Sequence, residues 1–170
     1  MTTNADFLSE GAKSYIDALS AIEAFEGLAR GACKAVYEKY KPQLVSKMGI
    51  RDADCHDHDN KDDLANGIAE LGVWQTTTSG REWLYVYLMW KVAKDGAIEV
   101  SACVSIQFST KNDRNKCAEL LRNSPSIQPG DAGYYLWSQR NLSDLSSCTE
   151  AFCSVLDEWL ACWPAGRRLK

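Results

Sequence analysis

The segment from Arg81 to Phe108 constrains the fold more than any other part of the chain. It consists of two runs rich in β-branched and aromatic residues, one on each side of Asp95-Gly96. An Asp-Gly pair between such runs predicts a β-hairpin with a two-residue type I′ turn, in which both turn residues have positive φ angles. We therefore expect two long antiparallel strands joined at Asp95-Gly96.

A two-residue turn also predicts the pairing register, and the register defines the two faces of the hairpin because side chains alternate along a strand. Trp90 then pairs with Ser101 and Leu84 with Gln107, so one face mixes large apolar residues with polar ones, including Glu99. A dry core does not accept an unpaired glutamate. The mixed face fits either a looser core layer beneath a helix or a surface that binds a partner. The opposite face is almost wholly apolar and is expected to be the core face.

Hydrophobic periodicity and capping signals predict the other elements. Apolar residues at three- and four-residue steps predict a long helix from about Ala5 to Tyr40, although Gly27 and Gly31 allow a break or kink in it. The expected elements after this helix are a strand at 68–76, the hairpin strands, a helix at 111–122, a strand at 134–140 and a last helix that ends at Pro164.

This element order predicts an α+β fold, with helices packed on a four-stranded sheet. The plan is a long N-terminal helix, a three-stranded antiparallel meander, a helix, a fourth strand and a C-terminal helix. A chain of 170 residues can bury an adequate core as one domain, so we expect a single α+β domain over 1–170. The basic residues near the C-terminus are expected to be solvated: Arg167, Arg168 and Lys170.

The segment at 51–63, RDADCHDHDNKDD, contains both histidines of the chain and six aspartates. Carboxylates and imidazoles bind divalent metals, so Asp54, His56 and His58 form a candidate metal site. The spacing differs from that of an EF-hand loop, because Asp57 stands where the sharp turn of that loop needs glycine. The other interpretation is an exposed acidic loop, whose Asp57 and Asp59 present a negative surface to a basic partner.

Composition limits the cellular compartment and the kinds of binding partner that we expect for this chain. The chain has seven cysteines, an odd number, and no CxxC pair. This pattern is typical of reduced thiols in a cytoplasmic protein. The polar N-terminus predicts that the chain is made without a secretory leader, and no apolar run is long enough to span a membrane. A formal net charge of -4 makes nucleic acid an unlikely partner. No cofactor motif is present, so no cofactor is expected.

Signatures of catalysis are equally scarce, since the chain has no GxSxG, phosphate-binding glycine loop or HExxH. The order of the first six elements resembles the core of the restriction-endonuclease-like fold, as a topology alone. A metal site of that kind needs an acid-x-lysine triplet, and neither Glu99-Val100-Ser101 nor Gln107-Phe108-Ser109 supplies the lysine. A degraded or divergent metal-dependent nuclease is therefore the alternative function.

The principal hypothesis is a non-enzymatic cytoplasmic module that binds another protein, or a second copy of itself, as immunity proteins, inhibitors and secretion chaperones do. Six tryptophans and seven tyrosines supply the residue types that are enriched at protein interfaces. The contact would use the acidic loop and the mixed sheet face. The candidate binding residues on the sheet are Trp90, Glu99, Ser101, Gln107 and Trp137.

Overall fold

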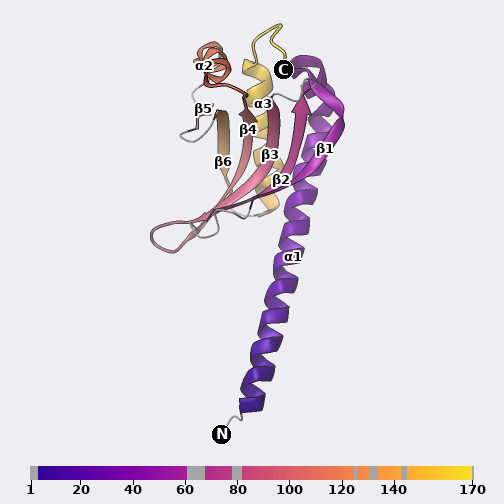
Figure 1. Ribbon diagram of the computed structural model, residues 1–170, viewed down its shortest axis with the longest axis vertical. Helices are drawn as coiled ribbons and strands as arrows, with labels where there is room; N and C mark the ends of the chain where they lie inside the picture. The colour runs from indigo at the N-terminus through magenta and orange to yellow at the C-terminus, as the bar shows by residue number, and fades with distance from the viewer. Residues whose placement is uncertain are drawn as a thin grey trace.

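A computed structural model describes residues 4–60, 68–77, 82–124, 126–130, 134–142 and 145–169. Over these ranges the order is helix, strands, helix, strand, helix, which confirms the predicted α+β fold (Figure 1). Two short turns flank the main helices, η1 (Leu44–Met48) of π type and η3 (Leu145–Ser147) of 3-10 type. The main elements are α1 (Asn4–Gln43), β1 (Ile50–Asn60), β2 (Ile68–Thr77), β3 (Trp83–Val92), β4 (Ile98–Gln107), α2 (Lys111–Leu120), β5 (Gln128–Pro129), β6 (Tyr135–Asn141) and α3 (Cys148–Cys162).

The described strands form one antiparallel sheet in the order β1-β2-β3-β4-β6-β5. The four predicted strands are β2, β3, β4 and β6, and β6 runs antiparallel to β4. The prediction of an acidic loop is wrong for residues 51–60, because these residues belong to strand β1 and pair with β2. An edge strand has one neighbour and can be rich in charge, which protects the sheet edge, so apolar alternation did not reveal it. Residues 61–63 lie outside the described part.

The β3–β4 hairpin pairs one residue out of the predicted register. Its loop has three residues rather than two: Ala93 N donates to Ala97 O at 2.8 Å, and Gly96 N donates to Ala93 O at 2.9 Å. Gly96 alone in this loop has a positive φ, +84°, which fits a three-residue loop that ends in a left-handed glycine. Trp90 consequently pairs with Val100, and the polar residues of β4 share a face with the aromatic residues of β3 instead of with its aliphatic ones.

The corrected register gives the sheet a largely apolar face, on which α1 and α3 pack. The β3 residues Leu84, Val86 and Leu88 lie opposite Ile106, Val104 and Ala102 of β4, and all six are buried in the core. One polar contact within the core ties α3 to the sheet, because Trp159 Nε1 donates to Ser138 Oγ at 2.7 Å. Burial of these side chains supplies the main driving force for docking the helices.

Helix α1 is continuous over its 40 residues, without a break at Gly27 or Gly31. Its C-terminal half packs on the sheet through buried residues that include Cys33, Val36 and Tyr40. Its N-terminal half extends well past the edge of the sheet, and residues 8–24 are all exposed (Figure 1). Within the described residues, no helix has both the length and the apolar character needed to cross a membrane.

The C-terminal segment is fastened to the body, and Arg167 is largely buried rather than solvated as predicted, whereas Arg168 is exposed. The Arg167 guanidinium lies 5.6 Å from the Phe108 ring and 5.5 Å from the Trp163 ring, and it forms an ion pair with the buried Glu82 at 3.3 Å. Leu169 N donates to Met48 O at 2.7 Å. The aromatic rings shield the ion pair from water, so the tail contributes to the core. Lys170 lies outside the described residues.

Substitution of Gly72 tests how closely β2 packs against β3. A Cβ at this position would lie 2.2 Å from Val86 O and 2.5 Å from Tyr87 Cα, which are backbone atoms that cannot yield. We expect Gly72→Ala to lower the free energy of unfolding by about 2 kcal/mol or more, through overpacking. Gly31→Ala is the control, because an added Cβ there meets nothing within 4 Å and alanine favours the helix. Urea unfolding should shift in opposite directions for the two variants, and equal shifts would contradict this packing.

The buried ion pair gives a second stability test. Glu82→Gln leaves the Arg167 charge without its buried counter-ion, so we expect a loss of about 3 kcal/mol in the free energy of unfolding. Glu119→Gln is the matched control, because Glu119 pairs with Arg122 at 2.7 Å on the exposed surface of α2 and should change stability by less than about 1 kcal/mol. A loss for Glu82→Gln no greater than for Glu119→Gln would show that the tail does not depend on this pair.

Candidate functional site

The face of the sheet away from α1 and α3 is the candidate site, and we call it the open face. Register and alternation place one residue in two from β3, β4 and β6 on this face. None of the core-forming aliphatic residues of these strands lies on it. Its members are Trp83, Tyr85, Tyr87, Met89 and Lys91 from β3, Glu99, Ser101, Cys103, Ser105 and Gln107 from β4, and Tyr135, Trp137, Gln139 and Asn141 from β6.

Aromatic rings form a connected row across one end of the open face. The Trp83 and Tyr85 rings are stacked with centroids 6.4 Å apart, and the Tyr85 and Tyr135 rings are tilted at 6.5 Å. Tyr85 Oη donates to Gln107 Oε1 at 2.8 Å, which fixes the ring orientation. The aromatic residues Trp83, Tyr85, Tyr135 and Trp137 are only partly buried. The row is therefore a pre-ordered apolar surface with accessible ring area.

Small polar side chains from β4 and β6 occupy the centre of the open face. Ser101 Oγ donates to Asn141 Oδ1 at 2.9 Å, and Ser105 and Cys103 are buried between their neighbours. Gln139, paired with Cys103, has a buried Oε1 that accepts no hydrogen bond from the described residues. A buried acceptor without a donor is unfavourable, so this amide is a point of strain beneath the surface of the open face.

The electrostatics of the open face are acidic to neutral. Burial raises the pKa of Tyr87 and that of Tyr85, and nearby acidic groups, including the Glu70 carboxylate of β2, raise both further. Burial and then Glu70 also raise the pKa of Tyr135. The cation Lys91 is neutralised by Glu99, with 3.0 Å between Nζ and the carboxylate. Tyrosines on this face consequently stay protonated, as hydrogen-bond donors, at neutral pH.

Four of the predicted binding residues share the open face: Glu99, Ser101, Gln107 and Trp137. Their β3 partners differ from those predicted, because the register shift replaces aliphatic residues by aromatic ones. The fifth, Trp90, lies on the helix side of the sheet and meets Phe25 of α1 edge-on at 5.2 Å, so the structure does not group it with the others.

The acidic segment contributes its backbone to the sheet edge. His56 pairs with Trp74 and His58 with Gly72, whereas Asp54 falls where the pairing is irregular, between Ile50 and Cys55. The predicted surface residues of this segment, Asp57 and Asp59, pair with Val73 and Leu71. The side chains of β1 from residue 51 onward lie outside the described part, so the candidate metal site stays a prediction. Among the side chains that are described, no three potential metal ligands come together.

The geometry of the hairpin separates the groups that a nuclease-like site would need. Glu99 and Gln107 stand at opposite ends of β4, eight residues apart, which corresponds to about 26 Å along an extended strand. Asp95 lies in the turn beyond one end, and Lys111 begins α2 beyond the other. A shared metal site requires ligands within a few ångström of one ion, so nothing in this arrangement favours the nuclease alternative.

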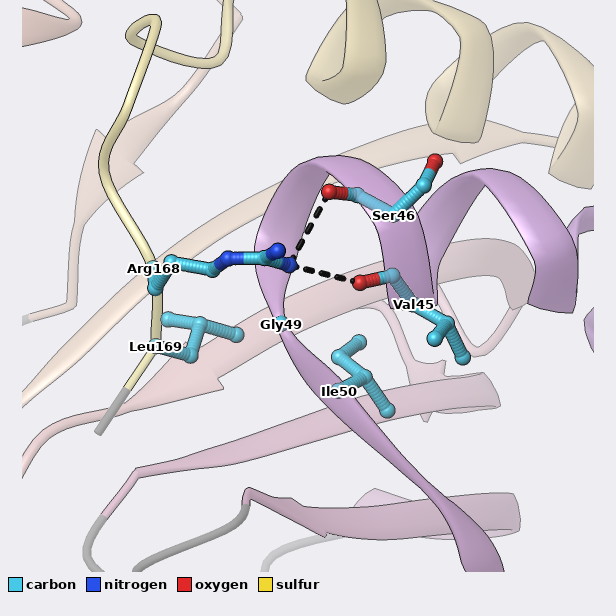
Figure 2. A pocket seen from close by; sticks show the side chains of 6 residues that line it. All are labelled: Val45, Ser46, Gly49, Ile50, Arg168 and Leu169. Atoms are coloured by element: carbon cyan, nitrogen blue, oxygen red, sulfur yellow. Dashed lines mark hydrogen bonds between the residues drawn. The ribbon is translucent and has the colours of Figure 1, made fainter.

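A surface pocket of about 380 Å³ lies where the C-terminal segment meets η1 (Figure 2). Arg168 reaches across it and donates from Nη1 to the carbonyl oxygens of Val45 and Ser46, at 2.9 and 3.0 Å. These carbonyls belong to the helix end before Gly49, whose φ of +77° ends the turn. The guanidinium therefore caps a helix C-terminus, which is a structural role.

Apart from Trp137, the residues of the aromatic row were not among the predicted site residues. The alternation of Trp83, Tyr85 and Tyr87 in the sequence indicates that they share one face of the sheet. The register predicted from a two-residue turn, however, placed that face in the core. Nothing in the sequence around Glu70 indicated a role for it, because Glu70 comes near three tyrosines only when β2 pairs with β3. The chain matches no family profile, no curated protein and no solved structure in comparisons with known proteins.

The raised tyrosine pKa values predict alkaline destabilisation. A group whose pKa is higher in the folded state stabilises the fold fully below its unfolded pKa, about 10 for tyrosine, and loses that contribution as pH rises further. We expect the urea midpoint to fall between pH 9.5 and about 11. In Tyr87→Phe this fall should be smaller, since the buried hydroxyl is gone. An equal fall in both proteins would contradict the assignment of Tyr87 as a buried neutral group.

Proposed function

We propose that this chain is a non-enzymatic protein-binding module of the cytoplasm, and that it contacts its partner through the open face. The observation that carries the proposal is the row of partly exposed aromatic rings, Trp83, Tyr85, Tyr135 and Trp137, on a face that neither α1 nor α3 covers. A further support is the core on the opposite face, whose buried cluster includes none of the four residues of the aromatic row.

Aromatic side chains suit this role for energetic reasons. Tryptophan and tyrosine dominate interface hot spots, because each buries a large area while losing few rotamers. The Trp83–Tyr85–Tyr135 contacts already hold the rings in place, so a partner would not have to order them. The polar groups beside them that reach solvent, Gln107 and Asn141, would supply hydrogen bonds that fix the partner's orientation.

The charges favour a basic protein segment over a nucleic acid. Single-stranded nucleic acids also stack on aromatic sheet faces, but they need lysines or arginines along the backbone path. On the described open face the one lysine, Lys91, is paired with Glu99, and Glu70 adds a negative charge near the tyrosines. The acidic strand β1 lies at the edge of the same sheet and would extend this field.

The thiols support a reducing compartment. The cysteines whose side chains are described are all free, and four of them are buried: Cys33, Cys103, Cys117 and Cys148. Burial raises the pKa of the Cys148 thiol and makes it a poor nucleophile, which suits a structural role. Disulfide-free chains with several cysteines are typical of the cytoplasm.

Neighbouring tyrosines give a matched test of the proposal. Tyr135 lies on the open face, whereas Tyr134 is exposed off that face, just before β6 begins. The partner is first isolated from extracts of the source organism by comparing wild type with Tyr135→Ala in quantitative mass spectrometry, and the purified pair is then measured by calorimetry. We expect Tyr135→Ala to weaken binding about tenfold or more and Tyr134→Ala to leave it within about twofold.

Both variants must retain the wild-type circular dichroism and cooperative unfolding. Equal affinities for the two variants would refute the open face as the contact surface. Tight binding of a single-stranded oligonucleotide, lost on Tyr135→Ala, would refute a protein partner in favour of a nucleic acid.

A further inference from the structure

The projecting half of α1 carries an apolar stripe that nothing in the described structure covers. Residues 8–24 are exposed, and five large apolar side chains among them are each between 43 and 70 % accessible to solvent. Monomeric proteins seldom leave such residues exposed in a continuous row. The five residues are Leu8, Tyr15, Ile16, Leu19 and Ile22.

Four of the five stripe residues follow a seven-residue repeat, and Ile16 lies directly beside it. Leu8, Tyr15 and Ile22 occupy one heptad position, and Ala12 and Leu19 occupy a second position four residues later. This alternation of four- and three-residue steps is the pattern by which two α-helices pack along a shared seam. The charged residues of this half, such as Glu10, Lys13 and Asp17, fall outside the seam.

The same repeat continues into the half of α1 that packs on the sheet. Ala29 and Val36 extend the first heptad position, and Cys33 and Tyr40 extend the second, and all four are buried in the core. Glu26, the polar member of the second position, forms an ion pair with Arg30 at 3.8 Å where the helix reaches the body. The same face of α1 is therefore covered by the sheet after Glu26 and exposed to solvent before Glu26.

We propose that the projecting half of α1 pairs with the same half of a second copy of this chain, in an antiparallel arrangement. Self-pairing fits because the stripe is identical in both copies and its seam carries no charge that would repel another copy. Each stripe offers roughly 450 Å² of apolar surface, taking about 90 Å² for each of the five side chains. Two stripes with their flanking residues approach the lower end of stable interfaces, about 1,200 Å² in total.

The body of the molecule decides the orientation. A parallel partner helix laid on residues 8–22 would continue alongside residues 29–40, where the sheet of the first chain already lies. An antiparallel partner instead ends with its N-terminus near Glu26 and places its own body at the far end. The two bodies then stand apart, joined by a helix pair whose overlap of about 20 residues spans about 30 Å.

A membrane surface is a poorer fit for the same stripe. Interfacial helices place lysines and arginines on the polar face, where they meet anionic lipids. The polar side of this half carries Glu10 and Asp17 against a single lysine, Lys13, so its net charge is negative. The pairing also uses none of the open-face residues, so it stands or falls independently of the proposed function.

Light scattering on the eluting protein tests the pairing directly. We expect the wild type to have twice the chain mass of 18.9 kDa, and Leu19→Asp to have the mass of one chain. Ser20→Asp is the matched control, because it places the same charge one residue away and outside the seam, and it should remain a dimer. Circular dichroism and thermal unfolding should show an intact fold in both variants, since residues 19 and 20 are exposed.

A wild-type protein that elutes as a single chain at concentrations of about 100 µM would overturn the proposal. So would a Leu19→Asp variant that stays as dimeric as Ser20→Asp. Wild-type monomers that bind vesicles of phosphatidylserine and phosphatidylcholine through Leu19 would replace self-pairing by membrane attachment.

Cross-linking tests the orientation. Antiparallel helices bring Leu8 of one copy next to Ile22 of the other, so a mixture of Leu8→Cys and Ile22→Cys proteins should give a hetero-cross-link with a short bismaleimide. Each variant alone should give no more cross-linked dimer than the parent protein, whose native cysteines set the background. Efficient cross-linking of Leu8→Cys with itself would show a parallel pair and contradict the arrangement.

Discussion

The pairing of β3 with β4 determines the character of both sides of the sheet. Its three-residue loop, closed by Gly96 in the left-handed conformation, brings Leu84, Val86 and Leu88 opposite apolar residues of β4. The helices can then dock on a dry surface. Trp83 and the tyrosines of β3 are left on the other side, together with the serines and Gln107 of β4. A single residue of register therefore separates what stabilises the fold from what is free to contact a partner.

Helix α1 shows how one repeating pattern can serve two purposes. Its buried half satisfies the heptad stripe with the sheet, through Cys33, Val36 and Tyr40, while its projecting half presents the same pattern to solvent. Helix formation has a costly first turn, and a packed body at one end supplies the nucleus from which the helix can extend. The body thus keeps the projecting stripe helical, and the stripe gives the body a means of association.

Much of the fold could be predicted from the sequence, because long periodic segments report their own structure. The 40-residue helix, the strands of the hairpin and the last helix all followed from apolar spacing and caps. The exact register did not, since an Asp-Gly pair suits a two-residue turn and the end of a three-residue loop, and only the β-sheet pairing distinguishes them. Trp90 illustrates the result: it was assigned to the mixed face, and it packs against Phe25 on the helix side.

The acidic strand was missed for a different reason. Edge strands are stabilised by backbone pairing on one side and tolerate charge, so RDADCHDHDN lacks the alternation by which strands are recognised. Sites built from several strands are the hardest to foresee. Glu70, Tyr85 and Tyr135 are far apart in sequence and come together only when β2, β3, β4 and β6 are aligned.

The clasp formed by residues 167–169 has a consequence for synthesis on the ribosome. Arg168 caps the helix turn at Val45 and Ser46, and Leu169 N bonds to Met48 O, so segments more than 120 residues apart complete each other. The carbonyl groups of η1 that bond to the tail stay solvated until the tail has left the ribosomal exit tunnel. The contacts of this segment therefore cannot be completed until residues 167–169 have been synthesised.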